Sequence, residues 1–240
     1  MHIYAIRHGQ SANNALDAAS TRDYMRTRHH DPELTATGRA QAEALARHLG
    51  AGRPGAAPTV ARLYTSPMVR ALETTRPIAA ALGLMPHVWP DLHEIGGLFQ
   101  EGEDGADIGF GGPSRAALAA SYPGWMLPES IGAAGWWEAA RGRERYPEAV
   151  ARAERVADAL RAMAAESDEN TAIVLVSHGG FLDLLVRVLL EQPLPEVERY
   201  PMIYLHNNTG VSLIALDGAG PGRLYFLNRL DHLPADLHTF

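Results

Sequence analysis

Cysteine and lysine are both absent from the 240-residue sequence. Without cysteine the protein has no disulfide, no thiolate nucleophile and no cysteine-ligated zinc. Without lysine, all 21 basic residues are arginine, which excludes Schiff-base chemistry and a P-loop lysine. The formal net charge of −7 is the opposite of the basic balance that nucleic-acid binders carry, so we expect no nucleic-acid partner.

Long apolar runs and an N-terminal targeting pattern are missing as well. The longest apolar stretches, residues 172–176 and 184–190, are far too short to span a bilayer. The N-terminus enters a strand-like run directly, without the basic and apolar regions of a signal peptide. We therefore expect a cytoplasmic protein with no membrane partner. Its hydrophobic content of 46% is enough for a sizeable core.

The first pattern along the chain is a short apolar run at residues 3–6 that ends in Arg7-His8-Gly9. Arg7 offers a rigid fork of donors suited to phosphate oxygens. His8 offers a ring nitrogen that can act as base, ligand or nucleophile, and Gly9 lets the backbone approach a ligand closely. Because open α/β sheets bind ligands at the carboxyl ends of their strands, this run predicts a site at that edge.

Three later strands are expected to deliver residues of the same character. Each is a short, mostly apolar run that precedes a helical or polar segment. If these strands share one sheet with the first, their carboxyl ends lie at the same edge. The strands and their residues are 60–64 with Arg70, 87–92 with Glu94, and 171–176 with His178.

Helical patterns alternate with these strands, so we predict an α/β fold: a three-layer, doubly wound, mostly parallel sheet with helices on both faces. The first and last histidine-bearing strands lie near opposite ends of the chain, which favours a single domain over residues 1–240. An irregular, tryptophan-containing stretch at 95–140 is interpreted as an insertion that covers the site. The expected helices are 34–48, 67–83, 147–166 and 181–190, and an edge hairpin (210–216, 223–227) and a tail (231–240) follow.

Two arginines, two histidines and a glutamate at one sheet edge suit phosphoryl transfer without a metal or cofactor. Arg7, Arg70 and His178 can hold phosphate oxygens and offset their charge. A neutral His8 can form a phosphohistidine, and nearby guanidinium groups disfavour its protonation. Glu94 can give a proton to the leaving group and later accept one from water.

Taken together, these residues resemble the histidine phosphatase superfamily, also called the phosphoglycerate mutase-like family. The resemblance spans residues 1 to about 216, with its motifs in the right order and spacing. Gln10 stands where many members have Glu, a difference that is common among the family's phosphatases. The matching stretches are 7–11 with Asn14, 34–42, 66–71 with Thr74-Thr75, 92–95, and 177–180.

The resemblance implies specific roles for these positions. It implies His8 as the phosphorylated nucleophile and Glu94 as the proton donor. It further implies that the phosphate pocket is formed by Arg7, Arg70 and His178, and that Ser11 and Asn14 line the pocket.

The function then lies between three alternatives: a phosphatase, a cofactor-dependent phosphoglycerate mutase, and a non-catalytic module that binds phospholigands or proteins. The resemblance implies that mutases need extra basic residues, whereas residues 96–104 are acidic and the next basic residue is Arg115. We therefore favour a phosphatase that takes a small phosphate ester and releases inorganic phosphate. The aromatic residues of the insertion suggest an apolar or aryl portion in the substrate, and they could equally serve a homodimer contact.

Several other polar residues are assigned no catalytic role. The sequence His29-His30-Asp31 is read as a solvated turn before Pro32, and Asn207-Asn208 lies near the site or serves turn chemistry. The histidines read as structural are His93, His206 and His232, and the acids that rival Glu94 are Asp91, Glu101 and Glu103.

Overall fold

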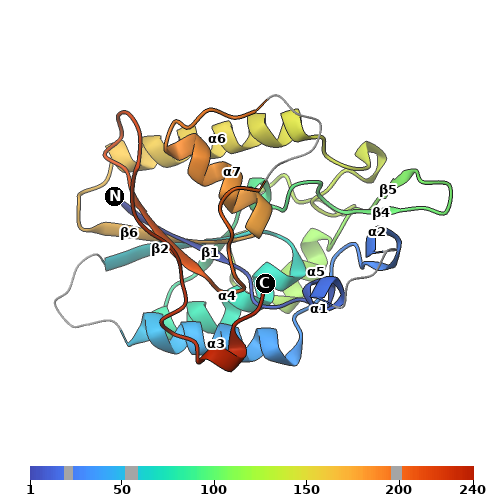
Figure 1. Cartoon of the computed structure of the whole chain (residues 1–240), viewed down its shortest axis with the longest axis horizontal. Coiled ribbons are helices and arrows are strands. Elements are labelled where there is room, and N and C mark those ends of the chain that lie inside the picture. Colours follow the sequence, from blue (N-terminus) through green and yellow to red (C-terminus); the bar gives the residue numbers. More distant parts are fainter. Residues whose placement is uncertain (19–23, 52–58, 196–201) are drawn as a thin grey trace.

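A six-stranded mixed sheet forms the centre of the computed structural model, which describes residues 1–18, 24–51, 59–195 and 202–240 (Figure 1). The strand order is β3-β2-β6-β1-β7-β8. The first four strands are parallel, and β7 and β8 form an antiparallel hairpin at one edge. The expected α/β sheet is therefore confirmed. The strands are β1 (His2–Arg7), β2 (Thr59–Thr65), β3 (Pro86–Val88), β6 (Thr171–Ser177), β7 (Val211–Ala215) and β8 (Arg223–Arg229).

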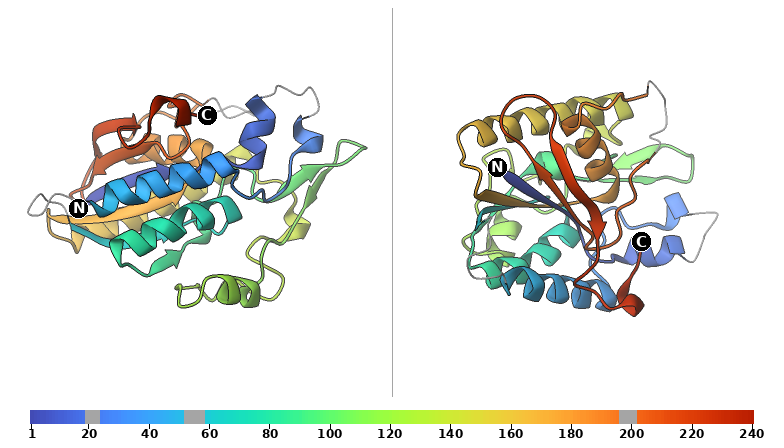
Figure 2. Two further views of the ribbon diagram at one scale, coloured as in Figure 1. Left: turned by 90° about the horizontal axis from the view of Figure 1, so that it is seen from below. Right: turned by 60° about the vertical axis from the view of Figure 1, so that its left-hand side comes forward.

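Helices cover both faces of this sheet, and the four long ones match the predicted segments closely (Figures 1 and 2). Helices α3 (Ala36–Gly50) and α4 (Val69–Leu82) pack together on one face, and α6 (Tyr146–Ala165) and α7 (Gly179–Leu189) pack on the other. Shorter elements connect them: α1 (Ala12–Ala18), α2 (Tyr24–Thr27), α5 (Arg115–Ser121) and the 3₁₀ turns Pro90–Leu92, Ala139–Arg141 and Ala235–Leu237.

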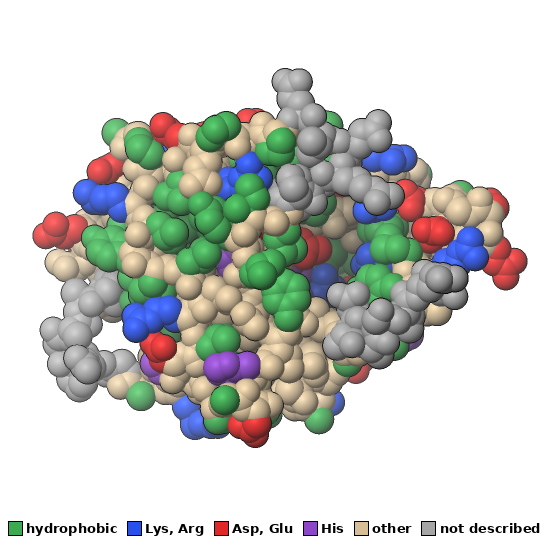
Figure 3. Space-filling model, in the orientation of Figure 1, with side chains coloured by type: hydrophobic (Ala, Val, Ile, Leu, Met, Phe, Trp, Pro, Cys, Tyr) green, Lys and Arg blue, Asp and Glu red, His purple; other side chains and the backbone are tan. Residues whose placement is uncertain are grey.

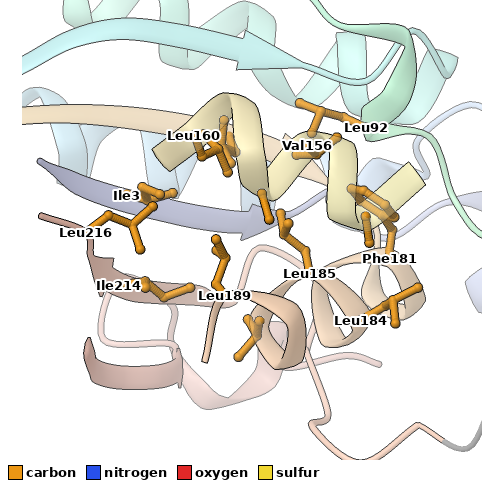
Figure 4. Packing of buried hydrophobic residues seen from close by; sticks show 14 of the residues in the cluster. Ile3, Leu92, Val156, Leu160, Phe181, Leu184, Leu185, Leu189, Ile214 and Leu216 are labelled. Carbon is orange, nitrogen blue, oxygen red and sulfur yellow. The ribbon is translucent and has the colours of Figure 1, made fainter. Parts of the chain in front are cut away.

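The core is divided by the sheet into two layers, as the alternation along β6 shows. Ile173 and Leu175 point into the cluster with α6 and α7 that Figure 4 displays. Val174 and Val176 point into the cluster with α3 and α4. Because the central strand β6 is buried among apolar side chains on both faces, the predicted site residue that follows it lies beyond its carboxyl end.

Two predicted boundaries were wrong. Helix α4 begins at Val69 rather than at Pro67, and the hydroxyl of Ser66 instead accepts a hydrogen bond from the amide of Met68 at 3.3 Å. The third strand ends at Val88 rather than at residue 92. Pro90, which has no N–H to donate to a sheet, opens a 3₁₀ turn there.

The stretch at 95–140, for which we predict a short helix over 113–121 within otherwise irregular structure, contains that helix and also a hairpin that was not predicted. It contains a hairpin of β4 (Phe99–Glu101) and β5 (Asp107–Gly109), which projects from the body of the protein, and helix α5 (Figures 1 and 2). Its later part lies beside strand β3, where the amide of Met126 donates to the carbonyl of Pro86 at 2.9 Å. This part of the segment therefore extends one sheet edge.

The C-terminal segment is docked on the body, which corrects its interpretation as a tail. The side-chain amide of Gln41, in helix α3, donates to the carbonyl of Leu237 and to the hydroxyl of Thr239, both at 2.8 Å. Across the described ranges of the chain, no helix is long and apolar enough to cross a membrane. The glycine-rich loop around 50–59 and the loop at 193–201 fall largely outside the described residues.

Candidate active site

The parallel pairing of β1 with β6 brings the two predicted catalytic histidines together. Arg7 pairs with Ser177 in register, so the next residues, His8 and His178, emerge side by side at the carboxyl edge. Their ring centroids are 5.0 Å apart, and both side chains are buried. The register of two strands that are distant in sequence thus forms the centre of the site.

The hydrogen bonds of His8 define which of its nitrogens is free to react. Nδ1 lies 2.6 Å from the carbonyl of Gly9, and a carbonyl can only accept, so Nδ1 carries the proton. Nε2 accepts from the Nε–H of Arg70 at 3.0 Å. This tautomer, assigned from the network, places the lone pair of Nε2 next to a guanidinium group.

Both histidines are held neutral by their surroundings. Burial, and then the charges of Arg70 and Arg7, lower the pKa of His8 well below its usual value. Burial and the charge of Arg70 likewise lower the pKa of His178. A neutral imidazole keeps its lone pair, so His8 is suited to nucleophilic attack across the ordinary pH range.

Arg70 lies against His8 and is joined to a carboxylate that sequence reasoning missed. Asp31, read as part of a solvated turn, has a side chain only 6% exposed, and its Oδ1 lies 3.9 Å from Arg70 Nη1. The same oxygen accepts from the amide of Val69 at 3.0 Å. Burial raises the pKa of Asp31 to about 6, and the charge of Arg70 partly opposes this rise. No local pattern marks Asp31, because its role depends on helix α4 folding over it.

Arg7 is held from the opposite side of the site by the C-terminal part of the chain. Its guanidinium donates to the backbone carbonyl of His206 and lies 4.8 Å from the ring centroid of Phe240. A Cβ at Gly179 would already lie 3.3 Å from Arg7 Nε, so the start of helix α7 leaves just enough room for this arginine. The orientation of Arg7 is therefore set by three segments.

Glu94 lies at the N-terminus of helix α7. Its carboxylate accepts from the amides of Phe181 at 2.9 Å, Gly180 at 3.2 Å and Ile95 at 2.8 Å. A Cβ at Gly180 would lie 2.9 Å from Glu94 Oε1, so the second glycine of the 179–180 pair makes space for the acid. Oε1 accepts two of these hydrogen bonds and Oε2 only one, so Oε2 keeps a lone pair at which Glu94 can carry a proton.

A buried ion pair fixes the loop that carries Glu94. Arg152, in helix α6, donates to both carboxylate oxygens of Glu144 at 2.8 and 2.7 Å. Its remaining terminal nitrogen donates to the carbonyls of Asp91 at 2.6 Å and His93 at 3.0 Å, directly before Glu94. His93, read as structural, lies 3.5 Å from the same Glu144 carboxylate. Glu94 is thus positioned by a hydrogen-bond network that the sequence did not indicate.

Ser11 and Asn14 form a second polar cluster beside His8. The Oδ1 of Asn14 accepts from the amide of Ser11 at 3.0 Å and from its hydroxyl at 2.9 Å. Asn208, for which two interpretations were open, donates from Nδ2 to the carbonyl of His8 at 3.2 Å and to Asn14 Oδ1 at 3.3 Å. This links the loop before β7 to the backbone of His8.

Other predicted features lie apart from this cluster. Asp91 forms an exposed ion pair with Arg155, and Glu101 forms one with Arg26. Trp137 packs with Met68 and Leu98 in a small apolar cluster, so this aromatic residue of the insertion is occupied by packing.

The site carries more donors than its own acceptors satisfy. Among the residues that the structure describes, Arg70 Nη1 and His178 Nδ1 are buried without a hydrogen-bond partner. His178 uses its other nitrogen toward the hydroxyl of Ser66 at 2.7 Å. Buried donors of this kind are suited to an incoming anion. No group of three or more metal-binding side chains occurs in the described part of the chain.

Comparison with known proteins places the chain in a family. Residues 3–228 match the family model of the histidine phosphatase superfamily (branch 1), and the chain belongs to that superfamily. The resemblance noted from the motifs is therefore confirmed over nearly the whole chain.

Solved structures with the same fold include a glucosyl-3-phosphoglycerate phosphatase, a phosphoserine phosphatase and the protein YhfR. Mycobacterial glucosyl-3-phosphoglycerate phosphatase, solved in complex with VO3, is 25% identical, with a TM-score of 0.59 and coverage of 95% of this chain and 98% of that chain. YhfR of Bacillus stearothermophilus is 21% identical, with a TM-score of 0.59 and coverage of 96% and 98%. A phosphoserine phosphatase of Entamoeba histolytica, in complex with 3-phosphoglyceric acid, is 20% identical, with a TM-score of 0.56 and coverage of 97% and 99%.

One curated relative is the PE-PGRS family protein PE_PGRS11 of Mycobacterium tuberculosis (strain ATCC 25618 / H37Rv). It is 36% identical over 100 residues, which amount to 40% of this chain and 15% of that protein. The chain thus spans a small part of that relative.

Proposed function

We propose that the protein is a phosphomonoesterase that acts through a phosphohistidine on a small phosphorylated substrate and needs no metal or cofactor. The observation that carries the proposal is the state of His8: neutral, buried and with Nε2 unprotonated beside Arg70. The family and the neighbours described as phosphatases support it. Its cytoplasmic location and a homodimer contact stay predictions.

In the first half-reaction, His8 Nε2 attacks phosphorus and forms an N–P bond while the ester P–O bond breaks. The leaving alkoxide takes a proton from Glu94, so no free alkoxide is released. Arg7, Arg70 and His178 supply donors for the phosphoryl oxygens, whose charge spreads in the transition state.

In the second half-reaction, water attacks the phosphohistidine while Glu94, now ionised, takes the proton from the water. The N–P bond breaks, inorganic phosphate leaves, and His8 and Glu94 return to their starting protonation states. Ser11 and Asn14 line the pocket in this proposal and hold the loop after the nucleophile.

The test is hydrolysis of p-nitrophenyl phosphate between about pH 5 and 8 in the presence of a chelator. Wild type is compared with His8→Ala and with His48→Ala, a matched control because His48 is an exposed histidine on helix α3. Quenching the reaction in alkali, which preserves phosphohistidine, then reports whether the wild type carries acid-labile phosphate.

Chelator-resistant hydrolysis that disappears in His8→Ala and persists in His48→Ala supports the proposal. Hydrolysis that survives in His8→Ala contradicts the assigned nucleophile. A folded wild type that releases no phosphate contradicts the phosphatase. Assaying 3-phosphoglycerate together with its bisphosphate primer then tests the mutase alternative. If no mutase activity is found either, the binding module is the alternative that remains.

A further inference from the structure

Two arginine side chains outside the predicted site lie over the ring of Phe99, the first residue of strand β4. The Cζ atom of Arg28 is 4.8 Å from the ring centroid, and that of Arg143 is 4.7 Å from it. Arg28 follows helix α2, and Arg143 lies just before helix α6. Two segments that are far apart in the sequence therefore bring two positive charges to one aromatic ring.

Phe99 packs against the loop that carries the predicted proton donor. A Cβ at Gly96, two residues after Glu94, would lie 2.7 Å from an edge atom of the Phe99 ring. The arginine pair is thus adjacent to the site, and Figure 3 shows a hollow in this face in which side chains of both charge signs are visible.

Among the described residues, neither of the two guanidinium groups forms an ion pair. In the described part of the chain, no carboxylate lies within 4.0 Å of the guanidinium group of Arg28 or of Arg143, and Arg28 Nε has no hydrogen-bond partner. Arg28 Nε is moreover buried. By contrast, their neighbours Arg26 and Arg141 pair with Glu101 and Glu148 at 3.4 and 3.1 Å.

The electrostatics agree with this geometry. Burial lowers the pKa of Arg28, the charges of Tyr24 and Glu94 partly oppose the effect, and Arg143 adds to it. Arg28 in turn contributes to the lowered pKa of Arg70, after burial and the opposing acids. Arg28 therefore lies within electrostatic reach of both Arg70 and Glu94, and its burial as a cation is unfavourable unless an anion binds.

We propose that Arg28 and Arg143 bind a second anionic group, a carboxylate or a phosphate, of a substrate whose ester phosphate lies at His8. This rests on the proposed function. Planar guanidinium forks recognise both kinds of anion, and stacking on Phe99 orients them. The substrate class is then a phosphate monoester that bears a further negative charge.

This proposal reverses the expectation that the acidic residues of 96–104 disfavour a multiply charged substrate. Glu101 is paired with Arg26, and Glu103 and Asp104 are exposed in the turn of the projecting β4–β5 hairpin. The charged groups beside Phe99 are instead the guanidinium groups of Arg28 and Arg143, so a substrate with more than one negative charge is favoured.

The test uses pairs of substrates that differ in the second anion. Glycerol 3-phosphate differs from 3-phosphoglycerate by a hydroxymethyl group in place of the carboxylate. Propane-1,3-diol monophosphate differs from its bisphosphate by one phosphate. The ratio of kcat/KM within each pair is measured for wild type, Arg28→Gln and Arg143→Gln. The matched controls are Arg26→Gln and Arg141→Gln, each two residues away and already paired with an acid.

Wild type is expected to prefer the more anionic member of at least one pair by about tenfold or more, the effect of one charge-assisted hydrogen bond. Each of Arg28→Gln and Arg143→Gln should remove most of that preference, while both controls keep it. The pair that shows the preference identifies carboxylate or phosphate as the anion. Turnover of p-nitrophenyl phosphate, which has no second anion, should change by less than about twofold in the two control variants.

A wild-type ratio near one in both pairs overturns the subsite while leaving the phosphatase intact. So does an equal loss on both members of a pair, which would mean that Arg28 acts only as a counterion of Glu94. If no substrate is hydrolysed, the proposed function fails first. In that case, calorimetry measures the dissociation constants of 3-phosphoglycerate and glycerol 3-phosphate for the same proteins. The ratio of the two constants in wild type and variants then tests the subsite.

Discussion

Two buried arginine–carboxylate pairs lie within this molecule, and they differ in geometry. Arg152 and Glu144 meet through two parallel hydrogen bonds of 2.8 and 2.7 Å. Arg70 and Asp31 approach at a single point, 3.9 Å apart. Arg152 uses every nitrogen of its guanidinium on protein acceptors, whereas Arg70 Nη1 has no hydrogen-bond partner in the described chain.

The carboxylates respond in opposite directions. Burial acts to raise the pKa of Glu144, but hydrogen bonds from Arg152 and His93 outweigh it, and the pKa falls. Burial raises the pKa of Asp31 to about 6, because the looser contact with Arg70 compensates only part of it. The first pair completes a scaffold, and the second leaves its cation available for a ligand.

The largest effect is expected from breaking the scaffold pair. Arg152→Gln leaves Glu144 buried without its cation, so the free energy of unfolding should fall by about 3–5 kcal/mol in denaturant titrations. Arg155, on the same helix, forms an exposed ion pair with Asp91, and Arg155→Gln should cost less than about 1 kcal/mol. Equal losses in the two variants would contradict the scaffold role.

Breaking the pair of Arg70 and Asp31 should lower the activity. Arg70→Gln removes a donor aimed at the proposed phosphoryl group, and kcat/KM for p-nitrophenyl phosphate should fall about 10²–10³-fold. Its unfolding free energy should fall by less than that of Arg152→Gln, because one contact at 3.9 Å is lost. Arg76→Gln, on the same helix, serves as the control. A large stability loss with little effect on kcat/KM would make Arg70 a second scaffold residue.

The pH dependence of stability sharpens the comparison. The pKa of Asp31 rises from 3.8 to about 6 on folding, so its favourable contribution is fully present below 3.8 and is lost as the pH rises through 6. Between pH 4 and 7, wild type should lose on the order of 3 kcal/mol of unfolding free energy relative to Asp31→Asn. Parallel pH profiles of the two proteins would show that Asp31 titrates normally.

The smallest effect is expected at the C-terminal segment. Phe240→Ala removes the ring beside the guanidinium of Arg7, a contact of about 0.5–1 kcal/mol at an exposed site. KM for p-nitrophenyl phosphate should rise about threefold with kcat little changed. Tyr225→Ala, an exposed aromatic residue on strand β8, should leave KM unchanged. An identical KM in both variants would exclude a role for Phe240 in orienting Arg7.

Much of the fold and of the site centre could be predicted because both depend on local patterns. The apolar run of β6 is short and continuous, and it ends in Ser177-His178, so strand and site residue were evident together. The pattern of this segment allows either Thr35 or Thr37 to cap helix α3, and in the structure Thr35 does. The start of helix α4 was misplaced because the hydroxyl of Ser66, a strong N-cap residue, contacts Met68 and His178 instead.

Local sequence patterns identify the residues that leave the ends of β1 and β6, which are Arg7 with His8 and His178, whereas Glu94 follows the 3₁₀ turn after β3. Strand direction and length are encoded in a few consecutive side chains, and the sheet then delivers their ends to one edge. What surrounds these residues depends on the tertiary structure, including Asp31 beside Arg70, Asn208 on the carbonyl of His8 and Phe240 on Arg7. These contacts join segments far apart in the chain, so they depend on packing between elements that no local pattern records.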